Sequence, residues 1–302
     1  MGATSEMARL LILGGNGRLA RLLRPAFTLL SAPPACIWQA RQAAPGIDLV
    51  FDPLSAPEAL TAAMARAEVT LVLAGRIQGT AEDLAVNTSL ALAALAAAAG
   101  RPVLLASSAA VYGAGQGPLR EEGPVQPLAP YGAAKLAMEA AAAKAGGPQC
   151  SLRIGNVAGA DALLGQEAPT GGRVLDVFGD GHGPARSYIG PLALAVALDR
   201  LAARAAAGES LPACLNLALP GVVGMDDLLR AAGETFRPRP APPTAIASVE
   251  LDVSRALALG LVPAPPADLP RAEAREELAQ AIWADLNRVR AKLRGMETET
   301  PE

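Results

Sequence analysis

The chain has 302 residues, 51% of them hydrophobic and 18% charged, and 26 basic against 29 acidic residues give a net charge of −3. This composition excludes a disordered chain and provides enough apolar material for one large or two modest domains. A nucleic-acid-binding surface is not expected, because that requires clustered cations. The longest apolar run, about residues 90–99, is too short for a membrane span of about 20 residues. Residues 1–7 do not have the pattern of a signal peptide, so we expect a cytoplasmic protein without a membrane partner.

Cysteine and histidine are scarce. Cys36, Cys150 and Cys214 are isolated in the sequence, and His182 is the single histidine. This excludes a CxxC redox pair, a zinc-binding spacing and a histidine-rich metal site, and we therefore predict no metal.

The first half of the chain alternates between apolar runs and helical stretches. Short apolar runs predict strands at residues 9–13, 35–38, 47–51, 69–73, 103–106 and 150–154. Helices are predicted between them at 18–30, 57–66, 80–99 and 131–145, where alanine and leucine dominate the third. Continuous apolar strands in βαβα order are typical of a parallel sheet covered on both faces, so the predicted fold class is α/β with a doubly wound Rossmann sheet.

After residue 155 the pattern changes, and Gly, Pro and Asp become frequent between 159 and 184. A helix is predicted at 192–207, a strand at 214–219, a proline-rich loop at 238–243 and an amphipathic helix at about 272–293. We expect a dinucleotide-binding domain over residues 1–157 and a smaller, interleaved substrate-binding portion over 158–302. Residues from about 190 to 219 would return to the first domain.

A glycine turn follows the first predicted strand. It satisfies GxGxxA, and its candidate cofactor-binding residues are Gly14, Gly15, Asn16, Gly17, Arg18 and Leu19. Glycine permits a tight turn and close approach of the backbone to a pyrophosphate, while the next helix offers free N–H groups to the phosphates. The alternative is a strand-to-helix turn without a ligand, but the strand before and the helix after favour the dinucleotide site.

The residues after the second predicted strand bear on the choice of cofactor. The acidic residue that holds the adenosine ribose should follow about 20 residues after the glycines, but no Asp or Glu lies between Glu6 and Asp48. Arg41 is instead a candidate for binding a 2′-phosphate, so NADP is predicted over NAD; the alternative is a solvated loop cation. Asp52 is placed to accept a hydrogen bond from the adenine amino group, or else to cap a helix.

A second motif is Tyr131-Gly-Ala-Ala-Lys135, in a chain with only three tyrosines. Residues four apart share a helix face, so the phenol and the ammonium would lie side by side. We expect the cation to lower the pKa of Tyr131 and make it a usable proton donor or acceptor. Ser108 ends the fifth predicted strand and could hydrogen-bond the reacting oxygen, whereas for Ser107 we favour strand-end capping.

These segments resemble the extended short-chain dehydrogenase/reductases, and more narrowly the NAD(P)-dependent epimerase/dehydratase group that includes UDP-galactose 4-epimerase. The resemblance rests on the glycine turn, on residues 107–113, on 130–135 with Glu139, and on 152–159. Further matches are Ala74 and Gly75 after the fourth predicted strand, Asn87 in the long helix, and the stretches 178–181, 186–189 and 216–219.

The resemblance implies a function. Ser108, Tyr131 and Lys135 would form the catalytic triad of a hydride-transferring oxidoreductase or epimerase acting on a sugar-type alcohol or carbonyl, nucleotide sugars included. Ala74, Gly75, Asn87, Tyr131 and Lys135 would contact the cofactor. Asn156 and Arg186 would bind the substrate diphosphate, and the alternative for Arg186 is an ion pair with Asp180 or Glu167.

Two departures from the family pattern lie in the substrate half. Residues 190–193 read Gly-Pro-Leu-Ala, and 237–240 read Arg-Pro-Arg-Pro. The alternative functions are therefore a reductase of a small carbonyl without a nucleotide, or a non-catalytic NAD(P)-sensing protein. A sensor needs no proton relay, so the Ser108, Tyr131 and Lys135 set argues against it.

The predicted helices 80–99 and 131–145 are apolar on more than one face. A helix that is apolar all round must be buried, and the sheet covers only one side of each. We predict a homodimer through these helices. The alternative is that the last helix of the same chain covers them.

Overall fold

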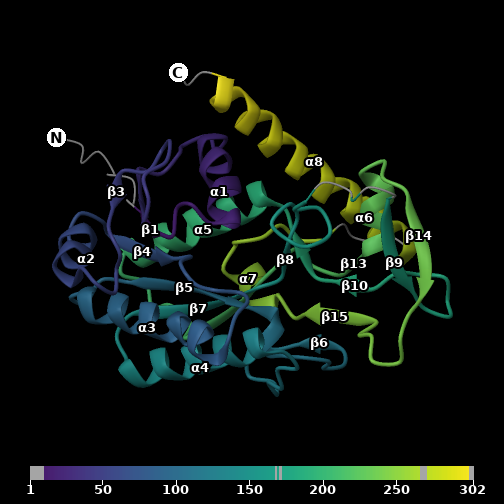
Figure 1. The fold of residues 1–302 in the computed structure, drawn as a ribbon, viewed down its shortest axis with the longest axis horizontal. Coiled ribbons are helices and arrows are strands. Elements are labelled where there is room, and N and C mark those ends of the chain that lie inside the picture. Colours follow the sequence, from purple (N-terminus) through teal and green to yellow (C-terminus); the bar gives the residue numbers. More distant parts are fainter. Residues whose placement is uncertain (1–9, 167–168, 170–171, 266–270, 299–302) are drawn as a thin grey trace.

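The computed structural model describes residues 10–166, 169, 172–265 and 271–298. Its centre is a seven-stranded sheet in the order β12-β7-β5-β4-β1-β2-β3, in which every neighbouring pair is parallel (Figure 1). The strands are β1 (Leu10–Leu13), β2 (Cys36–Ala40), β3 (Leu49–Val50), β4 (Val69–Val72), β5 (Val103–Ser108), β7 (Gln149–Ile154) and β12 (Cys214–Leu217). The predicted doubly wound α/β fold is confirmed.

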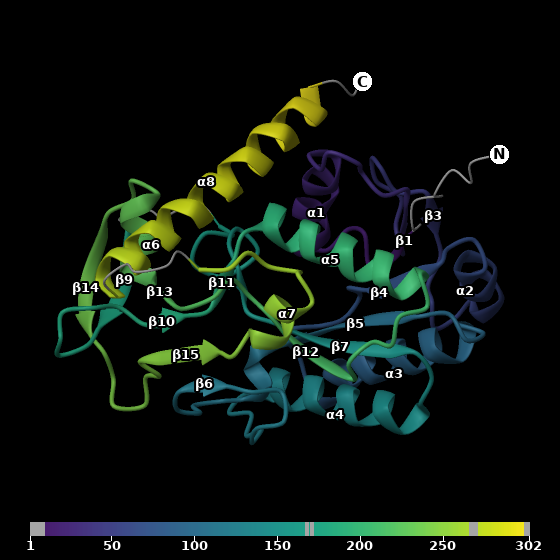
Figure 2. The ribbon, with the colours of Figure 1, turned by 180° about the vertical axis from the view of Figure 1, so that it is seen from behind.

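Helices cover both faces of this sheet (Figures 1 and 2). One face carries α1 (Arg18–Thr28) and α5 (Pro191–Ala206), and the other carries α2 (Pro57–Met64), α3 (Ala81–Ala97) and α4 (Pro130–Ala145). The residues of β1 show why the strands are apolar throughout. Leu10 and Ile12 join the core under α1 and α5, while Leu11 and Leu13 join the core under α2, α3 and α4.

A smaller sheet beside the first combines three strands from the second half of the chain with one strand from the first half. This second sheet has the order β13-β10-β15-β6, formed by β13 (Val223–Gly224), β10 (Ala185–Arg186), β15 (Ser248–Leu251) and β6 (Pro118–Leu119). Two separate pairs are β11 (Tyr188–Ile189) with β8 (Asn156–Val157), and β14 (Phe236–Pro240) with β9 (Arg173–Val177). The short helices are η1 (Ala109–Val111), α6 (Met225–Ala231) and α7 (Ser254–Ala258).

Most predicted elements are present with ends shifted by a few residues, but two differ. The predicted loop at 238–243 is wrong in part, because residues 236–240 form β14. Its prolines are tolerated because β14 pairs with a single neighbour, β9, and proline is accepted on edge strands. The predicted strand at 47–51 shrinks to Leu49–Val50, since the Asp48 carboxylate, not a backbone carbonyl, accepts from the Trp38 N–H at 2.7 Å. Arg9, predicted to begin the first strand, and residues 1–7 lie outside the described residues.

The last helix, α8 (Arg271–Thr298), does not cover α3 and α4. It packs on α1, α5 and α6, on the opposite side of the central sheet (Figures 1 and 2). The alternative to dimerisation that relied on this helix is therefore wrong. The outward faces of α3 and α4 bear exposed Ala85, Ser89, Leu92, Ala96, Ala133, Ala137 and Ala140.

Helix α8 also explains one departure from the family pattern. The N-terminus of α5 has Gly190 as its cap residue, which provides no side chain. The carboxylate of Asp285 on α8 accepts from the N–H groups of Leu192 and Ala193, each at 2.8 Å. A Cβ on residue 190 would lie 2.2 Å from the Asp285 carboxyl carbon, so glycine is required there. None of the described helices is long and apolar enough to cross a membrane.

Candidate active site

Ser108 and Tyr131 come together because α4 begins against the end of β5. Pro130 occupies the first helical position, which places Tyr131 in the first turn. Gly132 lies so close to η1 that a Cβ would stand 2.4 Å from the Ala110 carbonyl oxygen. This approach lets the side chains of Tyr131 and Ser108 hydrogen-bond. The Ser108 hydroxyl also accepts from the Ala110 N–H at 3.2 Å, so the serine is held at the end of the strand.

Lys135 lies one turn further along α4 and is 5% exposed. Its Nζ donates to the Ala106 carbonyl oxygen at 2.7 Å and stands over the ring of Tyr131, 5.9 Å from the ring centroid. The predicted side-by-side placement of the two residues is present. The ammonium faces the ring and the backbone of β5, so it contacts the aromatic face of the tyrosine.

Burial governs the proton affinities at this site. It lowers the pKa of Lys135 to about 8, although the negative charge of Glu139 opposes this shift. Burial raises the pKa of Tyr131, and the hydrogen bond with Ser108 offsets that rise only in part. The predicted lowering of the Tyr131 pKa by a neighbouring cation is therefore wrong for this arrangement. The raised pKa of Tyr131 favours the neutral phenol at neutral pH, and the lowered pKa of Lys135 still favours the ammonium there.

A cleft of about 570 Å³ opens at the carboxyl edge of β1, β2 and β4. Its lining includes seven residues predicted to bind the cofactor: Gly14, Asn16, Gly17, Arg41, Asp52, Ala74 and Gly75. Gly15 is buried beneath the turn, and Arg18 and Leu19 begin α1. Gly75 on this lining lies close to α4, because a Cβ on Gly75 would lie 3.7 Å from the Lys135 Nζ.

The cleft fits a dinucleotide. Gly14 has φ +99°, and a Cβ there would stand 2.6 Å from the Ala74 nitrogen, so only glycine lets the turn approach the end of β4 this closely. Gly17 caps α1 without a side-chain hydrogen bond, which leaves the first N–H groups of an 11-residue helix available to phosphate. Asn87 is buried behind Gly75; its Nδ2 donates to two backbone carbonyls, while its Oδ1 has no partner among the described residues.

Arg41 and Asp52 both line the cleft. Arg41 is exposed and directly follows β2. The Asp52 Oδ1 accepts from the Leu54 N–H at 2.9 Å, so it has a loop-capping role, and it lines the cleft as well.

Sequence reasoning missed Gln39, which is 1% exposed at the end of β2. Its Oε1 accepts from the Gly14 N–H at 3.3 Å and its Nε2 donates to the Phe51 carbonyl. The Gln39 amide therefore connects the glycine turn to the residue that follows β3. The available signal was a polar residue in a buried strand at the place where an acidic residue was sought.

Asn156 follows β7 at the same edge of the central sheet as Ser108, and Arg186 lies two residues before Tyr188, the residue that pairs with Asn156. Ser108 pairs with Ile154 across β5 and β7, and Asn156 follows two residues later. Asn156 pairs with Tyr188 in β8 and β11, and its side chain hydrogen-bonds the tyrosine. The Tyr188 hydroxyl in turn donates to Asp161 at 2.8 Å.

The guanidinium of Arg186 contacts backbone carbonyls rather than an acid. It donates to Ala185 at 2.7 Å and to Ile246 at 2.9 Å. No carboxylate pairs with it among the described residues; the Asp180 carboxylate accepts from the His182 N–H instead. Glu167, the other proposed partner, lies outside the described residues. Burial lowers the pKa of Arg186. A half-buried cation without a counter-charge suits an anionic ligand.

His182 lies apart from this edge, at 3.4 Å from the Asp226 carboxylate. Within the described ranges, no cluster of three or more His, Cys, Asp or Glu side chains could hold a metal ion.

The sequence profile of the NAD dependent epimerase/dehydratase family matches residues 10–178. The chain belongs to this family. A UDP-glucose 4-epimerase from Azospirillum brasilense is 31% identical over 197 residues, which are 58% of this chain and 57% of that protein. The chain thus matches little more than half the length of this curated relative.

Solved structures share the fold of this family over nearly the whole chain. MoeE5 in complex with UDP-glucose and NAD has a TM-score of 0.71 at 19% identity, covering 94% of this chain and 99% of that one. The UDP-glucose 4-epimerase of Thermus thermophilus in complex with NAD has a TM-score of 0.68 at 21% identity, with 93% and 99% covered.

Proposed function

We propose that this protein is a nicotinamide-dinucleotide-dependent epimerase or oxidoreductase that acts on a hydroxyl or carbonyl group of a nucleotide sugar. The observation that supports the proposal is the contact of Ser108 with Tyr131 and of Tyr131 with Lys135, together with the approach of Lys135 to Gly75 on the lining of the cleft. A non-catalytic sensor would have no use for this proton-handling set.

Each of the three side chains has a separate role in this proposal. Tyr131 exchanges a proton with the sugar oxygen, since its phenol is neutral and already hydrogen-bonded to a hydroxyl. Ser108 orients that oxygen. Lys135 stabilises negative charge that develops on the phenol and is placed to contact the nicotinamide ribose. The bound dinucleotide supplies the hydride acceptor and donor.

Gly14, Gly17 and the first turn of α1 would hold the pyrophosphate, and Asn87 would offer its free Oδ1 beside Gly75. The MoeE5 and Thermus structures hold NAD, which makes NAD the first form to test. Arg41 on the cleft, with no acid at the end of β2, is the feature that would admit NADP.

Arg186 is the reason to propose a nucleotide-linked substrate rather than a small carbonyl. Its guanidinium is half-buried, has no described carboxylate beside it and lies two residues from Tyr188, which contacts Asn156. A diphosphate would supply the missing negative charge through paired, charge-assisted hydrogen bonds.

We also propose a homodimer through the outward faces of α3 and α4. These faces are nearly uncharged and carry small side chains that allow two helices to approach closely. Leu92 is 39% exposed there, and α8 lies on the other side of the sheet.

The direct test is to incubate the purified protein with NAD or NADP and UDP-glucose or UDP-galactose, and to follow epimer formation and reduced cofactor. Tyr131→Phe removes the exchangeable proton and retains the ring. We expect turnover to fall by about 10²-fold or more with cofactor affinity unchanged. Turnover close to wild type in Tyr131→Phe would rule out the assigned proton donor.

A further inference from the structure

A buried chain of polar side chains runs from α4 to β12. Ser107 donates to Glu139, which lies one turn after Lys135. Glu139 accepts from both Nε and Nη2 of Arg153, the latter at 2.7 Å. Arg153 Nη1 donates to the Tyr112 hydroxyl at 2.9 Å, and this hydroxyl donates to the Asn216 Oδ1 at 2.7 Å. All five side chains are less than a tenth exposed. The role of Ser107 is therefore a side-chain contact, and the predicted strand-end cap is wrong.

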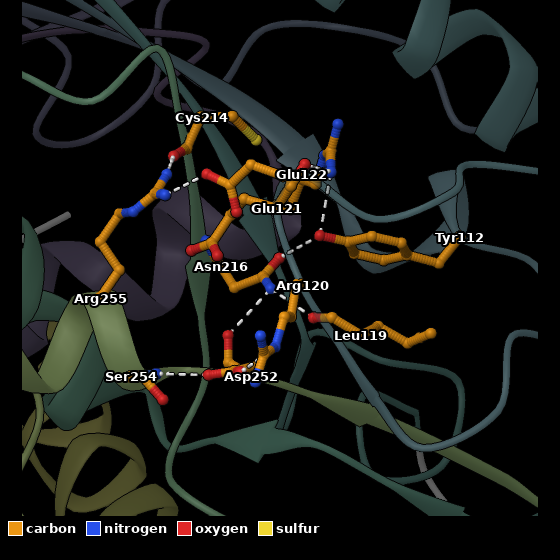
Figure 3. Close-up of polar contacts among 11 residues, drawn as sticks. Tyr112, Leu119, Arg120, Glu121, Glu122, Cys214, Asn216, Asp252, Ser254 and Arg255 are labelled. Atoms are coloured by element: carbon orange, nitrogen blue, oxygen red, sulfur yellow. Dashed lines mark hydrogen bonds and ion pairs between the residues drawn. The ribbon is translucent and has the colours of Figure 1, made fainter.

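Asn216 connects this chain to the second sheet. Figure 3 shows its amide between Tyr112, Leu119 and Asp252. Its Nδ2 donates to the Leu119 carbonyl at 2.7 Å and to the Asp252 carbonyl at 2.9 Å. Leu119 is the last residue of β6, and Asp252 directly follows β15. One fully buried amide therefore holds two strands of the second sheet against the central sheet.

The strand held in this way carries the contacts of Arg186. Strand β15 pairs with β10 in parallel, with Arg186 opposite Val249. The Arg186 guanidinium donates to the carbonyl of Ile246, just before β15. The Ser187 hydroxyl accepts from the Leu251 N–H at 2.9 Å, which ties the other end of β15 to the residue after Arg186. The placement of Arg186 thus depends on the placement of β15.

We propose that Tyr112 and Asn216 are positioning residues that set the separation between Arg186 and Tyr131. This inference rests on the proposed function, in which Arg186 holds the diphosphate and Tyr131 meets the sugar. A substrate bound at both ends reacts only when Arg186 and Tyr131 are correctly spaced. Misplacement by about 1 Å can lower the rate by about two orders of magnitude.

The chemistry of the chain suits this task. Glu139 and Arg153 form a buried ion pair at 2.7 Å, so each charge in this hydrogen-bonded series has a partner of opposite sign within it. Burial raises the pKa of Tyr112 to about 12, and the hydrogen bond from Arg153 opposes the rise. The hydroxyl therefore keeps its proton, and with it the bond to Asn216, at neutral pH.

The test uses Tyr112→Phe, which removes one hydroxyl from the middle of the chain and keeps the ring. Asn216→Ala removes the hydrogen bonds to the Leu119 and Asp252 carbonyls. The double variant tests whether the two residues act together. The control is Asp285→Asn, which weakens a buried contact between α8 and α5 away from the chain. We measure binding of NAD and of UDP by calorimetry, kcat/KM for UDP-glucose, and hydrogen exchange of residues 246–251.

For Tyr112→Phe we expect kcat/KM for UDP-glucose to fall about five- to tenfold, as loss of one net hydrogen bond implies, with the dissociation constants of NAD and UDP unchanged. UDP needs only the Arg186 end, whereas the complete substrate needs both ends. The double variant should lose less than the product of the single losses. The Asp285→Asn control should lower the melting temperature without changing these constants.

Two results would overturn the proposal. One is an unchanged kcat/KM in both single variants; the other is an equal loss of NAD binding, UDP binding and turnover, which would indicate a general structural role. A wild-type protein that neither binds UDP nor converts UDP-glucose defeats the proposed function. In that case hydrogen exchange of residues 246–251 decides the question. Faster exchange in Tyr112→Phe than in the control supports the structural connection from Tyr112 through Asn216 to β15, and unchanged exchange refutes it.

Discussion

Replacing Lys135 by methionine should stabilise the fold at neutral pH and strongly reduce turnover. Burial lowers the pKa of this lysine from 10.5 to about 8, against the pull of Glu139. Between those two values the unfolded chain binds more protons than the folded one, so stability rises with pH across that window. At pH 7 the buried ammonium costs about 3 kcal/mol, since each unit of pKa difference corresponds to about 1.4 kcal/mol.

Methionine removes that cost and keeps a flexible apolar side chain of similar length. It also removes the hydrogen bond from Nζ to the Ala106 carbonyl at 2.7 Å, which is worth about 1 kcal/mol. The net expectation is a gain of about 2 kcal/mol at pH 7. Turnover should fall by about 10²-fold or more, because the developing phenolate of Tyr131 loses its cation.

Urea unfolding at pH 7 and at pH 10 measures both effects. Wild type should become more stable relative to Lys135→Met as the pH rises, until most of the difference has gone. Lys144→Met, at an exposed lysine in the last turn of the same helix, is the matched control and should change stability by less than about 0.5 kcal/mol. If Lys135→Met is less stable than wild type at pH 7 and the difference is independent of pH, burial does not govern this lysine.

Three further predictions concern the cofactor, the substrate and the assembly. Arg41→Ala should weaken the binding of NADP about tenfold and leave the binding of NAD unchanged, because only NADP carries the 2′-phosphate. If the wild type binds NAD more tightly than NADP and the variant changes neither affinity, the sequence-based preference for NADP is wrong. Arg186→Ala should raise KM for UDP-glucose about tenfold, with NAD binding unchanged in calorimetry. An unchanged KM would mean that Arg186 only stabilises the backbone of residues 246–247. Leu92→Glu should convert a dimer to a monomer in light scattering at micromolar concentration, because it places a charge in the proposed α3 and α4 interface; a wild-type monomer at every concentration would exclude that interface.

The sequence alone was sufficient for the central architecture, because the relevant signals are local. Apolar runs such as Leu10–Leu13 and the glycines that follow specify a buried strand and a tight turn within a few residues. The spacing of Tyr131 and Lys135 likewise placed them on one helical face. The order of strands and helices then fixed the doubly wound sheet, and the position of Ser108 at a strand end placed it near the proposed site.

Contacts between distant segments were decided by the tertiary structure. No local pattern indicates that Asp285 caps α5 in place of a side chain at Gly190, or that Asn216 joins Leu119 to Asp252. The pKa of Tyr131 could not be obtained from the spacing of the motif, because burial and the direction of the Lys135 ammonium toward Ala106 depend on how α4 meets β5. Strand β14 formed despite its prolines because β9, about 60 residues earlier, offers it an edge. Local sequence specifies which elements form and which chemical groups they carry, whereas burial, hydrogen-bond partners and the spacing between groups arise only when those elements pack.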